Sequence, residues 1–111
     1  MAKINYVELA ADDLAEATRF YGDAFGFEFT GFGPSYAATT TGTVDLGLQA
    51  DLVEAPAAPL AVIEVADLDA AQAAVERAGG VVTRAIFAFP GGRRFHFRDP
   101  AGNELAAVKG D

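Results

Sequence analysis

The chain has 111 residues, no cysteine and a formal net charge of −8. This length suits one domain, and hydrophobic residues make up 51% of it, which is enough for a packed core. The lack of cysteine excludes disulfides, thiolate catalysis and cysteine-bound metal. The acidic charge argues against nucleic acid and anionic membrane surfaces as partners, because both would repel it. No segment has the length of a membrane span or the apolar core of a signal peptide, so we expect a cytoplasmic protein.

The sequence contains an internal repeat that begins with a short alternating run and an Asp-Leu pair. Asp13-Leu14 recurs 54 residues later as Asp67-Leu68. Each aspartate is placed to cap a helix. Apolar residues at helical spacing follow each pair and predict an amphipathic helix. They are Leu14, Ala17, Tyr21 and Ala24 in the first copy, and Leu68, Ala71, Val75 and Ala78 in the second. The helices are expected to end at Gly26 and Gly80.

Short runs of strand-forming residues precede and follow each predicted helix. Between the last two runs, Pro100 and Gly102 are typical of a tight turn, because proline presets φ and glycine permits φ > 0. Residues 54–59 contain two prolines and predict a linker. The expected strands are residues 7–11, 27–32, 36–41, 43–49, 61–65, 81–88, 93–98 and 104–108.

Each half of the chain therefore has the pattern β-α-β-β-β. We expect one α+β domain, with module 1 at about residues 1–53, the linker at 54–59 and module 2 at about 60–111. One such module cannot bury both its helix and its sheet. Two tandem βαβββ modules can form one curved eight-stranded sheet with the helices on the convex face.

Alternation along the strands divides their side chains between the two faces of the sheet. Val7 and Leu9 suit the face that the helix covers. The opposite, concave face is expected to form a small-molecule pocket of mixed polarity. The residues predicted there are Tyr6, Glu8, Asp45, Gln49, Leu60 and Ala106. His96, the single histidine, lies between Phe95 and Phe97 and is expected on the concave face as well.

Three segments connect the chain to a known family. They are Val7-Glu8-Leu9-Ala10-Ala11-Asp12-Asp13-Leu14, Phe20-Tyr21-Gly22-Asp23-Ala24-Phe25-Gly26-Phe27 and Phe97-Arg98-Asp99-Pro100-Ala101-Gly102-Asn103. With these motifs in this order, the chain resembles the vicinal oxygen chelate superfamily, which holds glyoxalase I, bleomycin-resistance proteins and extradiol dioxygenases. The resemblance spans essentially the whole chain. It implies paired βαβββ modules and a homodimer, but no single activity.

The resemblance also implies where a divalent metal would be held. Metal-using members bind the ion with His, Glu or Gln from the first and last strands of the modules. The matching positions here are Tyr6, Gly47, Leu60 and Ala106. None of them supplies the imidazole or carboxylate that such ions prefer. We therefore expect no metal and no cofactor, and we assign no catalytic residue.

Polar side chains of the predicted pocket each admit two interpretations. His96 is either an acid–base group or a hydrogen-bonded lining residue. Glu8 and Glu64 are either a buried pair with split pKa values or two solvated carboxylates. Asp45 and Gln49 are ~13 Å apart along one strand, so they cannot chelate one ion together. Each either binds a ligand through a hydrogen bond or is satisfied by water.

The remaining aromatic and basic residues are also open to two interpretations. The aromatic residues Phe27, Phe29, Phe32 and Tyr36 line the pocket or a dimer interface, or simply pack in the core. Arg93 and Arg94 bind a carboxylate or phosphate, or they pair with surface carboxylates.

Three functions follow from these patterns. The favoured one is metal-independent binding of a small organic molecule, and the net charge suits a neutral or cationic ligand such as bleomycin. The second is a lyase, isomerase or dioxygenase whose metal ligands have moved to a set drawn from Glu8, Asp45, His96 and Glu104. The third is an interaction subunit that assembles through exposed strand edges.

Overall fold

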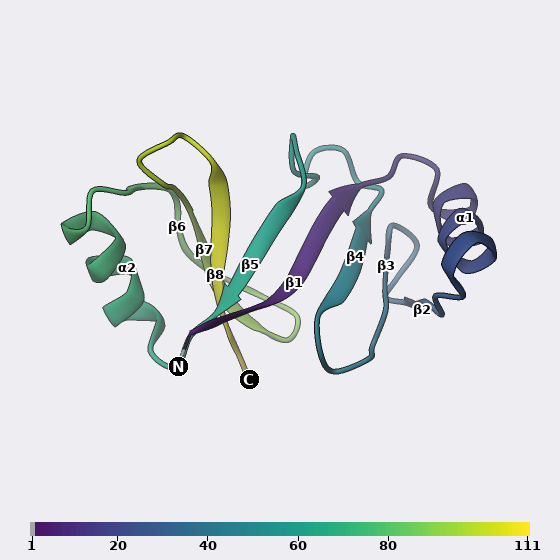
Figure 1. Ribbon diagram of the computed structural model, residues 1–111, viewed down its shortest axis with the longest axis horizontal. Coiled ribbons are helices and arrows are strands. Elements are labelled where there is room, and N and C mark those ends of the chain that lie inside the picture. Colours follow the sequence, from purple (N-terminus) through teal and green to yellow (C-terminus); the bar gives the residue numbers. More distant parts are fainter. Residues whose placement is uncertain (1) are drawn as a thin grey trace. The chain divides into compact units, whose positions relative to one another are not determined.

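The computed structural model describes residues 2–111 and contains ten elements in the predicted β-α-β-β-β order, taken twice (Figure 1). The first module contains β1 (Lys3–Ala10), α1 (Leu14–Phe25), β2 (Thr30–Gly31), β3 (Tyr36–Ala38) and β4 (Asp45–Gln49). The second contains β5 (Leu60–Glu64), α2 (Leu68–Arg77), β6 (Val81–Phe89), β7 (Gly92–Arg98) and β8 (Glu104–Gly110). No helix among the described residues is long and apolar enough to cross a bilayer.

In the first module the strands follow one another in the hydrogen-bonded order β2-β3-β4-β1, and in the second module in the order β5-β8-β7-β6. Within each module the first strand pairs in parallel with the last one, as β1 does with β4 and β5 with β8. The other pairs within the modules are antiparallel. The expected α+β class and the two βαβββ modules are thereby confirmed.

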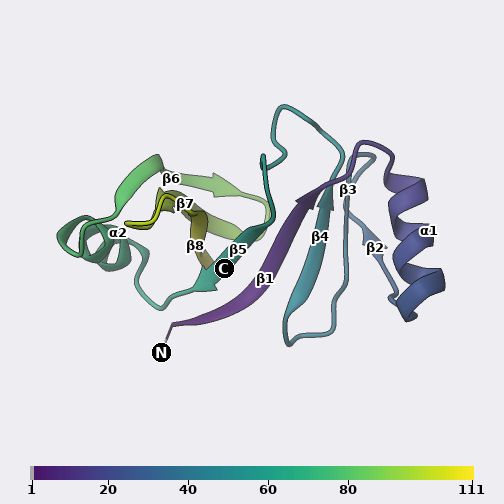
Figure 2. The same cartoon turned by 45° about the horizontal axis from the view of Figure 1, so that its top comes forward.

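The chain divides into two compact units. Unit 2 comprises Tyr6–Leu60, and unit 1 comprises Ala61–Asp111 together with the first residues of the chain. The division after Leu60 falls at the expected start of module 2. Strand β1 contributes to both units, because Lys3–Asn5 belong to unit 1 and the rest of the strand to unit 2. Figure 2 shows the strands and helix of each unit from a second direction.

Both helices begin at the predicted caps. The Asp13 carboxylate accepts a hydrogen bond from the Glu16 backbone N–H at 3.0 Å, and Asp67 does the same for Ala70. Helix α1 ends at the predicted Gly26, whose φ of 73° only glycine adopts readily. Helix α2 ends earlier than predicted, at Arg77, because Ala78 caps it and Gly79, with a φ of 100°, turns the chain away before Gly80. The aspartate caps and the end of α1 are local patterns, which explains why the sequence alone predicted them.

Unit 1 has a well-filled core between α2 and its strands. Leu68 of α2 packs with Phe95 and Phe97 of β7 and with Ala107 of β8, and all four are buried. The two phenyl rings lie 5.8 Å apart between their centroids. Their burial confirms the alternation predicted for β7, which places both rings on the face that α2 covers.

Three strand predictions in the first module were too long. The strand expected at 27–32 is reduced to Thr30–Gly31. Phe27 and Phe29 instead pack against the ring of Tyr21 in α1, at centroid distances of 6.2 and 6.4 Å. The strands expected at 36–41 and 43–49 are shortened to β3 and β4, since the residues between them form a turn around the carboxylate of Asp45.

Candidate functional site

One face of the unit 2 sheet carries the polar residues that alternation predicted there. Parallel pairing puts Tyr6 beside Asp45 and Glu8 beside Gly47. Antiparallel pairing puts Tyr36 of β3 beside Gln49 on the same face. Leu9 and Leu48 point to the other face, toward α1. The face assignment made for these residues from the sequence is thereby confirmed.

A hydrogen-bonded chain of three side chains crosses this face. The Tyr36 hydroxyl donates to Glu8 Oε1 at 3.0 Å, and the Tyr6 and Tyr36 hydroxyls are hydrogen-bonded to each other. A phenol has one proton, so Tyr36 accepts from Tyr6 while it donates to Glu8. Only 3% of Glu8 is exposed. The chain therefore leads from Tyr6 to a buried carboxylate.

Tyr36 is held in its neutral form by this environment. Burial raises its pKa, and the charge of Glu8 and the hydrogen bond with Tyr6 raise it further, far above the ordinary value of 10.0. The sequence placed Tyr36 only in an aromatic cluster and missed its role. Its partners are 28 and 30 residues away along the chain, and no local pattern reveals such a pairing.

The positions of the family's metal ligands do not fit a metal here. A Cβ atom at Gly47 would overlap the hydroxyls of Tyr6 and Tyr36, so the two phenols fill the space that a ligand side chain would need. The other two positions, Leu60 and Ala106, are apolar and buried, with 1% and 0% exposed. Across residues 2–111, no group of three or more His, Asp or Glu side chains is arranged to hold an ion.

Asp45 and Gln49 make local hydrogen bonds. The Asp45 carboxylate accepts hydrogen bonds from the Thr39 hydroxyl, from the Thr41 hydroxyl and N–H, and from the Gly42 N–H. Desolvation raises the pKa of Asp45, but these hydrogen bonds outweigh it and lower the pKa to about 2. Gln49 Oε1 accepts a hydrogen bond from the Asp51 N–H at 2.9 Å. Asp45 thus organises the turn before β4.

The corresponding face of the unit 1 sheet carries His96. His96 pairs with Ala106, opposite the face of Phe95, as predicted. Its Nδ1 lies 3.9 Å from Glu104 Oε2, and its ring lies 5.7 Å from that of Phe87. The guanidinium of Arg94 lies 5.4 Å from the Phe87 ring centroid. This face therefore combines aromatic, basic and acidic side chains.

Glu8 and Glu64 have different environments. Glu8 is buried and hydrogen-bonded to Tyr36. The side chain of Glu64 is 47% exposed, lies 3.9 Å from the Lys3 ammonium and accepts a hydrogen bond from Asn5. Of the two interpretations made from the sequence, the solvated one describes Glu64, and burial describes Glu8.

Comparisons with known proteins agree with this architecture. Among solved structures, a hypothetical protein from Bacillus halodurans C-125 has a TM-score of 0.83 at 13% identity, covering 99% of this chain and 95% of its own. Methylmalonyl-CoA epimerase from Mycobacterium tuberculosis has a TM-score of 0.74 at 18% identity, with coverages of 97% and 87%. The Mn(II)-bound glyoxalase from Novosphingobium aromaticivorans has a TM-score of 0.69 at 23% identity, and this chain, covered to 98%, spans 40% of its length. These likenesses show the fold.

The family is shown by the sequence itself. No curated protein matches the chain. The family model of the Glyoxalase/Bleomycin resistance protein/Dioxygenase superfamily matches residues 3–107, which is nearly the whole chain. The chain therefore belongs to the glyoxalase/bleomycin resistance protein/dioxygenase superfamily.

Proposed function

We propose that this protein binds a small organic molecule without a metal, through the face of the unit 2 sheet that carries Glu8. The observation that carries the proposal is the hydrogen-bonded chain of Tyr6, Tyr36 and Glu8, which fills the space above Gly47 where the family would place a metal ligand. Among the described residues, no group of three or more His, Asp or Glu side chains is arranged here to coordinate a divalent ion. The hydroxyl and carboxylate groups of this face can instead form hydrogen bonds with an organic ligand.

The chemistry of these groups defines the class of ligand. A buried carboxylate forms strong hydrogen bonds with N–H and O–H donors, and strongest with charged ones. The Tyr6 and Tyr36 rings add flat apolar surface beside the carboxylate. The net charge of −8 repels anions at long range. The preferred ligand is a neutral or cationic molecule with at least one strong hydrogen-bond donor.

The first experiment measures metal content. Protein purified without chelators is analysed for bound elements, and its melting temperature is compared with and without Mn²⁺, Zn²⁺ and Ni²⁺. We expect no stoichiometric metal and no stabilisation by the ions. If the protein instead holds an ion tightly, and His96→Ala loses both the ion and turnover, the protein is an enzyme whose metal ligands lie at other positions than the family's usual ones.

The second experiment measures ligand binding by thermal shift with bleomycin and a panel of aromatic amines, phenols and carboxylic acids. Compounds that stabilise the protein are then tested against Glu8→Gln and Tyr36→Phe. Loss of a hydrogen bond to a charged group costs about 1.5–3 kcal/mol, so Glu8→Gln should weaken binding roughly 10- to 100-fold. Glu64→Gln is the matched control, because it makes the same charge change at the exposed glutamate. If Glu8→Gln and Glu64→Gln lose equal ligand affinity, the ligand does not bind at Glu8 and the proposal is contradicted.

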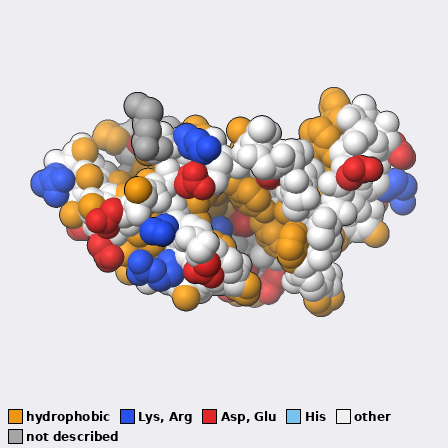
Figure 3. Space-filling model, turned by 90° about the horizontal axis from the view of Figure 1, so that it is seen from below, with side chains coloured by type: hydrophobic (Ala, Val, Ile, Leu, Met, Phe, Trp, Pro, Cys, Tyr) orange, Lys and Arg blue, Asp and Glu red, His pale blue; other side chains and the backbone are white. Residues whose placement is uncertain are grey.

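We also propose that the protein forms a homodimer. A cytoplasmic location is proposed as well, from the sequence alone. Support for the dimer comes from the large hydrophobic side chains exposed on the surface, among them Phe25 and Phe32. On the face shown in Figure 3, hydrophobic side chains lie exposed among acidic and basic ones. Sedimentation velocity should show one species of twice the chain mass, and a monomer at all concentrations would contradict this part.

A further inference from the structure

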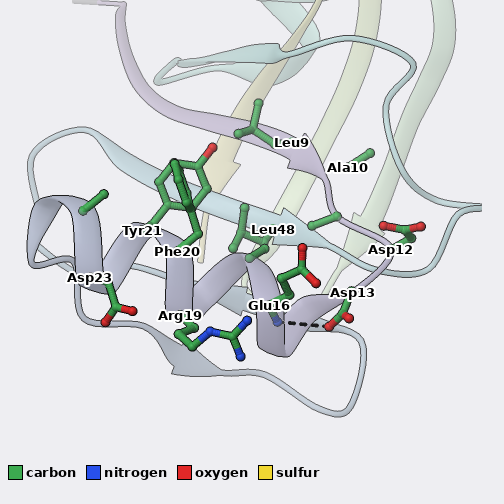
Figure 4. A pocket seen from close by; sticks show the side chains of 13 residues that line it. Leu9, Ala10, Asp12, Asp13, Glu16, Arg19, Phe20, Tyr21, Asp23 and Leu48 are labelled. Atoms are coloured by element: carbon green, nitrogen blue, oxygen red, sulfur yellow. Dashed lines mark hydrogen bonds between the residues drawn. The ribbon is translucent and has the colours of Figure 1, made fainter.

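A cavity of about 740 Å³, open to solvent, lies in unit 2 between α1 and the sheet, on the face opposite Glu8 (Figure 4). Leu9 of β1 and Leu48 of β4, which are paired in the sheet, form its strand side. Phe20 and Tyr21 of α1 form part of its helix side. This volume lies within the range of sites that hold drug-sized ligands.

The strand positions beside the lining residue Leu48 differ between the two modules. In unit 1, Phe95 pairs with Ala107, which pairs with Ile63. In unit 2, the same pattern places Ala37 beside Leu48, which pairs with Leu9. The first module therefore carries a methyl group at Ala37 where the second carries the ring of Phe95, and Leu48 where the second carries Ala107.

The ring of Phe97 is missing in the same way. Phe97 pairs with Leu105 in unit 1, and Thr39 takes its place beside Leu46 in unit 2. Both of these strand positions lack a ring in unit 2, and α1 has no buried residue, whereas α2 buries Leu68.

Charges on the lining of the cavity have one predominant sign. Asp12 and Asp13 lie where β1 leads into α1, and Glu16 and Asp23 lie on the helix itself (Figure 4). Arg19 is the single cation among the lining residues. Four carboxylates against one guanidinium give an excess of three negative charges around an apolar interior, which favours a cation with an apolar body.

We propose that this cavity is a second binding site, for a flat organic cation. The rings of Phe20 and Tyr21 meet edge to face, with centroids 5.1 Å apart and an interplanar angle of 80°. Aromatic faces attract cations within about 6 Å, and the carboxylates add attraction from the rim. A second copy of the chain fits less well. A two-fold interface centred here would oppose the acidic rim with an identical acidic rim.

The test uses three acridines of the same ring system at neutral pH. The probes are 9-aminoacridine, which is a cation, acridine, which is largely neutral, and acridine-9-carboxylate, which is an anion. Binding is measured by fluorescence titration and calorimetry. We expect the cation to bind about tenfold more tightly than the neutral probe, to lose affinity as salt is added, and the anion not to bind. Equal binding of all three, or no binding, would overturn the proposal.

Variants then locate the site. Ala17→Phe fills the cavity and should abolish binding of 9-aminoacridine, whereas Ala15→Phe, on the same helix but outside the lining, should not. If Ala17→Phe does not fold, Ala24→Leu serves in its place. The double variant Asp12→Asn/Asp23→Asn should weaken binding several-fold more than Asp69→Asn/Glu76→Gln, which changes the net charge equally on α2.

Two further results distinguish this cavity from the Glu8 face and from an interface with a second copy of the chain. Glu8→Gln can remove only dye bound on the opposite face of the sheet, so the binding that Ala17→Phe abolishes should persist in Glu8→Gln. Loss of all binding in Glu8→Gln, or equal loss in Ala15→Phe and Ala17→Phe, would place the dye elsewhere and overturn the proposal. A change of sedimentation in Ala17→Phe would show that a second copy occupies the cavity, which also overturns it.

Discussion

The two units have the same pattern of strand pairing, but the space between helix and sheet is filled more completely in unit 1 than in unit 2. In unit 1, α2 rests on the rings of Phe95 and Phe97, and four residues form a buried cluster. In unit 2, Ala37 and Thr39 occupy the matching places and α1 leaves a cavity beside Leu48. The same backbone pairing can therefore occur in both modules, whereas the size of a few side chains decides whether the space between helix and sheet is a filled core or a cavity.

The largest expected effect is on the filled layer. Phe95→Ala removes a fully buried ring and should lower the free energy of unfolding by about 3–5 kcal/mol, since the lost transfer energy adds to the cost of a cavity. Urea denaturation measures the change. Phe32→Ala, at a half-exposed ring, should stay within about 0.5 kcal/mol. A small effect at Phe95 would mean that unit 1 does not depend on this layer.

Tyr36→Phe tests the opposite face of unit 2. The change removes the donor to the buried carboxylate of Glu8, which should lower stability by about 1–3 kcal/mol at neutral pH. Because the folded pKa of Tyr36 is raised above the unfolded value of 10.0, its contribution is complete below that pH. It declines above it, where only the unfolded chain releases the proton.

Melting curves measured upward from neutral pH check this expectation. The wild-type protein should lose stability above about pH 10 more steeply than Tyr36→Phe. Parallel losses in the two proteins would show that Tyr36 does not retain its proton in the folded state.

Asp45→Asn tests the turn that shortens the strands of the first module. Replacing the carboxylate turns one of its two acceptor oxygens into an NH2 donor, so the side chain can no longer accept from both the Thr41 and the Gly42 N–H groups, which should cost about 1–2 kcal/mol. The pKa of Asp45 is about 2 when folded and 3.8 otherwise, so its contribution is complete above pH 3.8 and is lost as the pH falls toward 2. Acid denaturation should therefore be less steep in Asp45→Asn over this window. An unchanged acid profile would remove Asp45 from this role.

The smallest effects are expected at the helix caps. Asp13→Ala and Asp67→Ala each remove one carboxylate cap and should each cost about 1 kcal/mol. Equal losses would show that the repeat is energetically symmetric at the helix ends although its cores differ. If only Asp67→Ala lowers stability, α1 is packed too weakly for its cap to contribute to the free energy of unfolding. Thermal melts of the two variants decide between these outcomes.

Much of the backbone could be predicted from the sequence because the signals are local. The turn after β7 is an example, since Asp99 accepts hydrogen bonds from the N–H groups of Ala101 and Asn103, and Gly102 has a φ of 93°. Alternation also placed Glu8 and His96 on the correct faces of their strands. Phe27 and Phe29 were misjudged because residues that favour strands pack equally well against a helix, and only their neighbours decide between the two.

The sequence by itself determined the repeat, the aspartates that cap the helix N-termini, the turn at Asp99 and the alternation of faces along the strands, because each depends on neighbours a few positions away. Only the tertiary structure decided that Tyr6, Tyr36 and Glu8 join in one hydrogen-bonded chain and that α1 leaves a cavity above Leu48. Those outcomes depend on which side chains from distant strands meet. Spacing along a chain carries no information on the volume that remains between them.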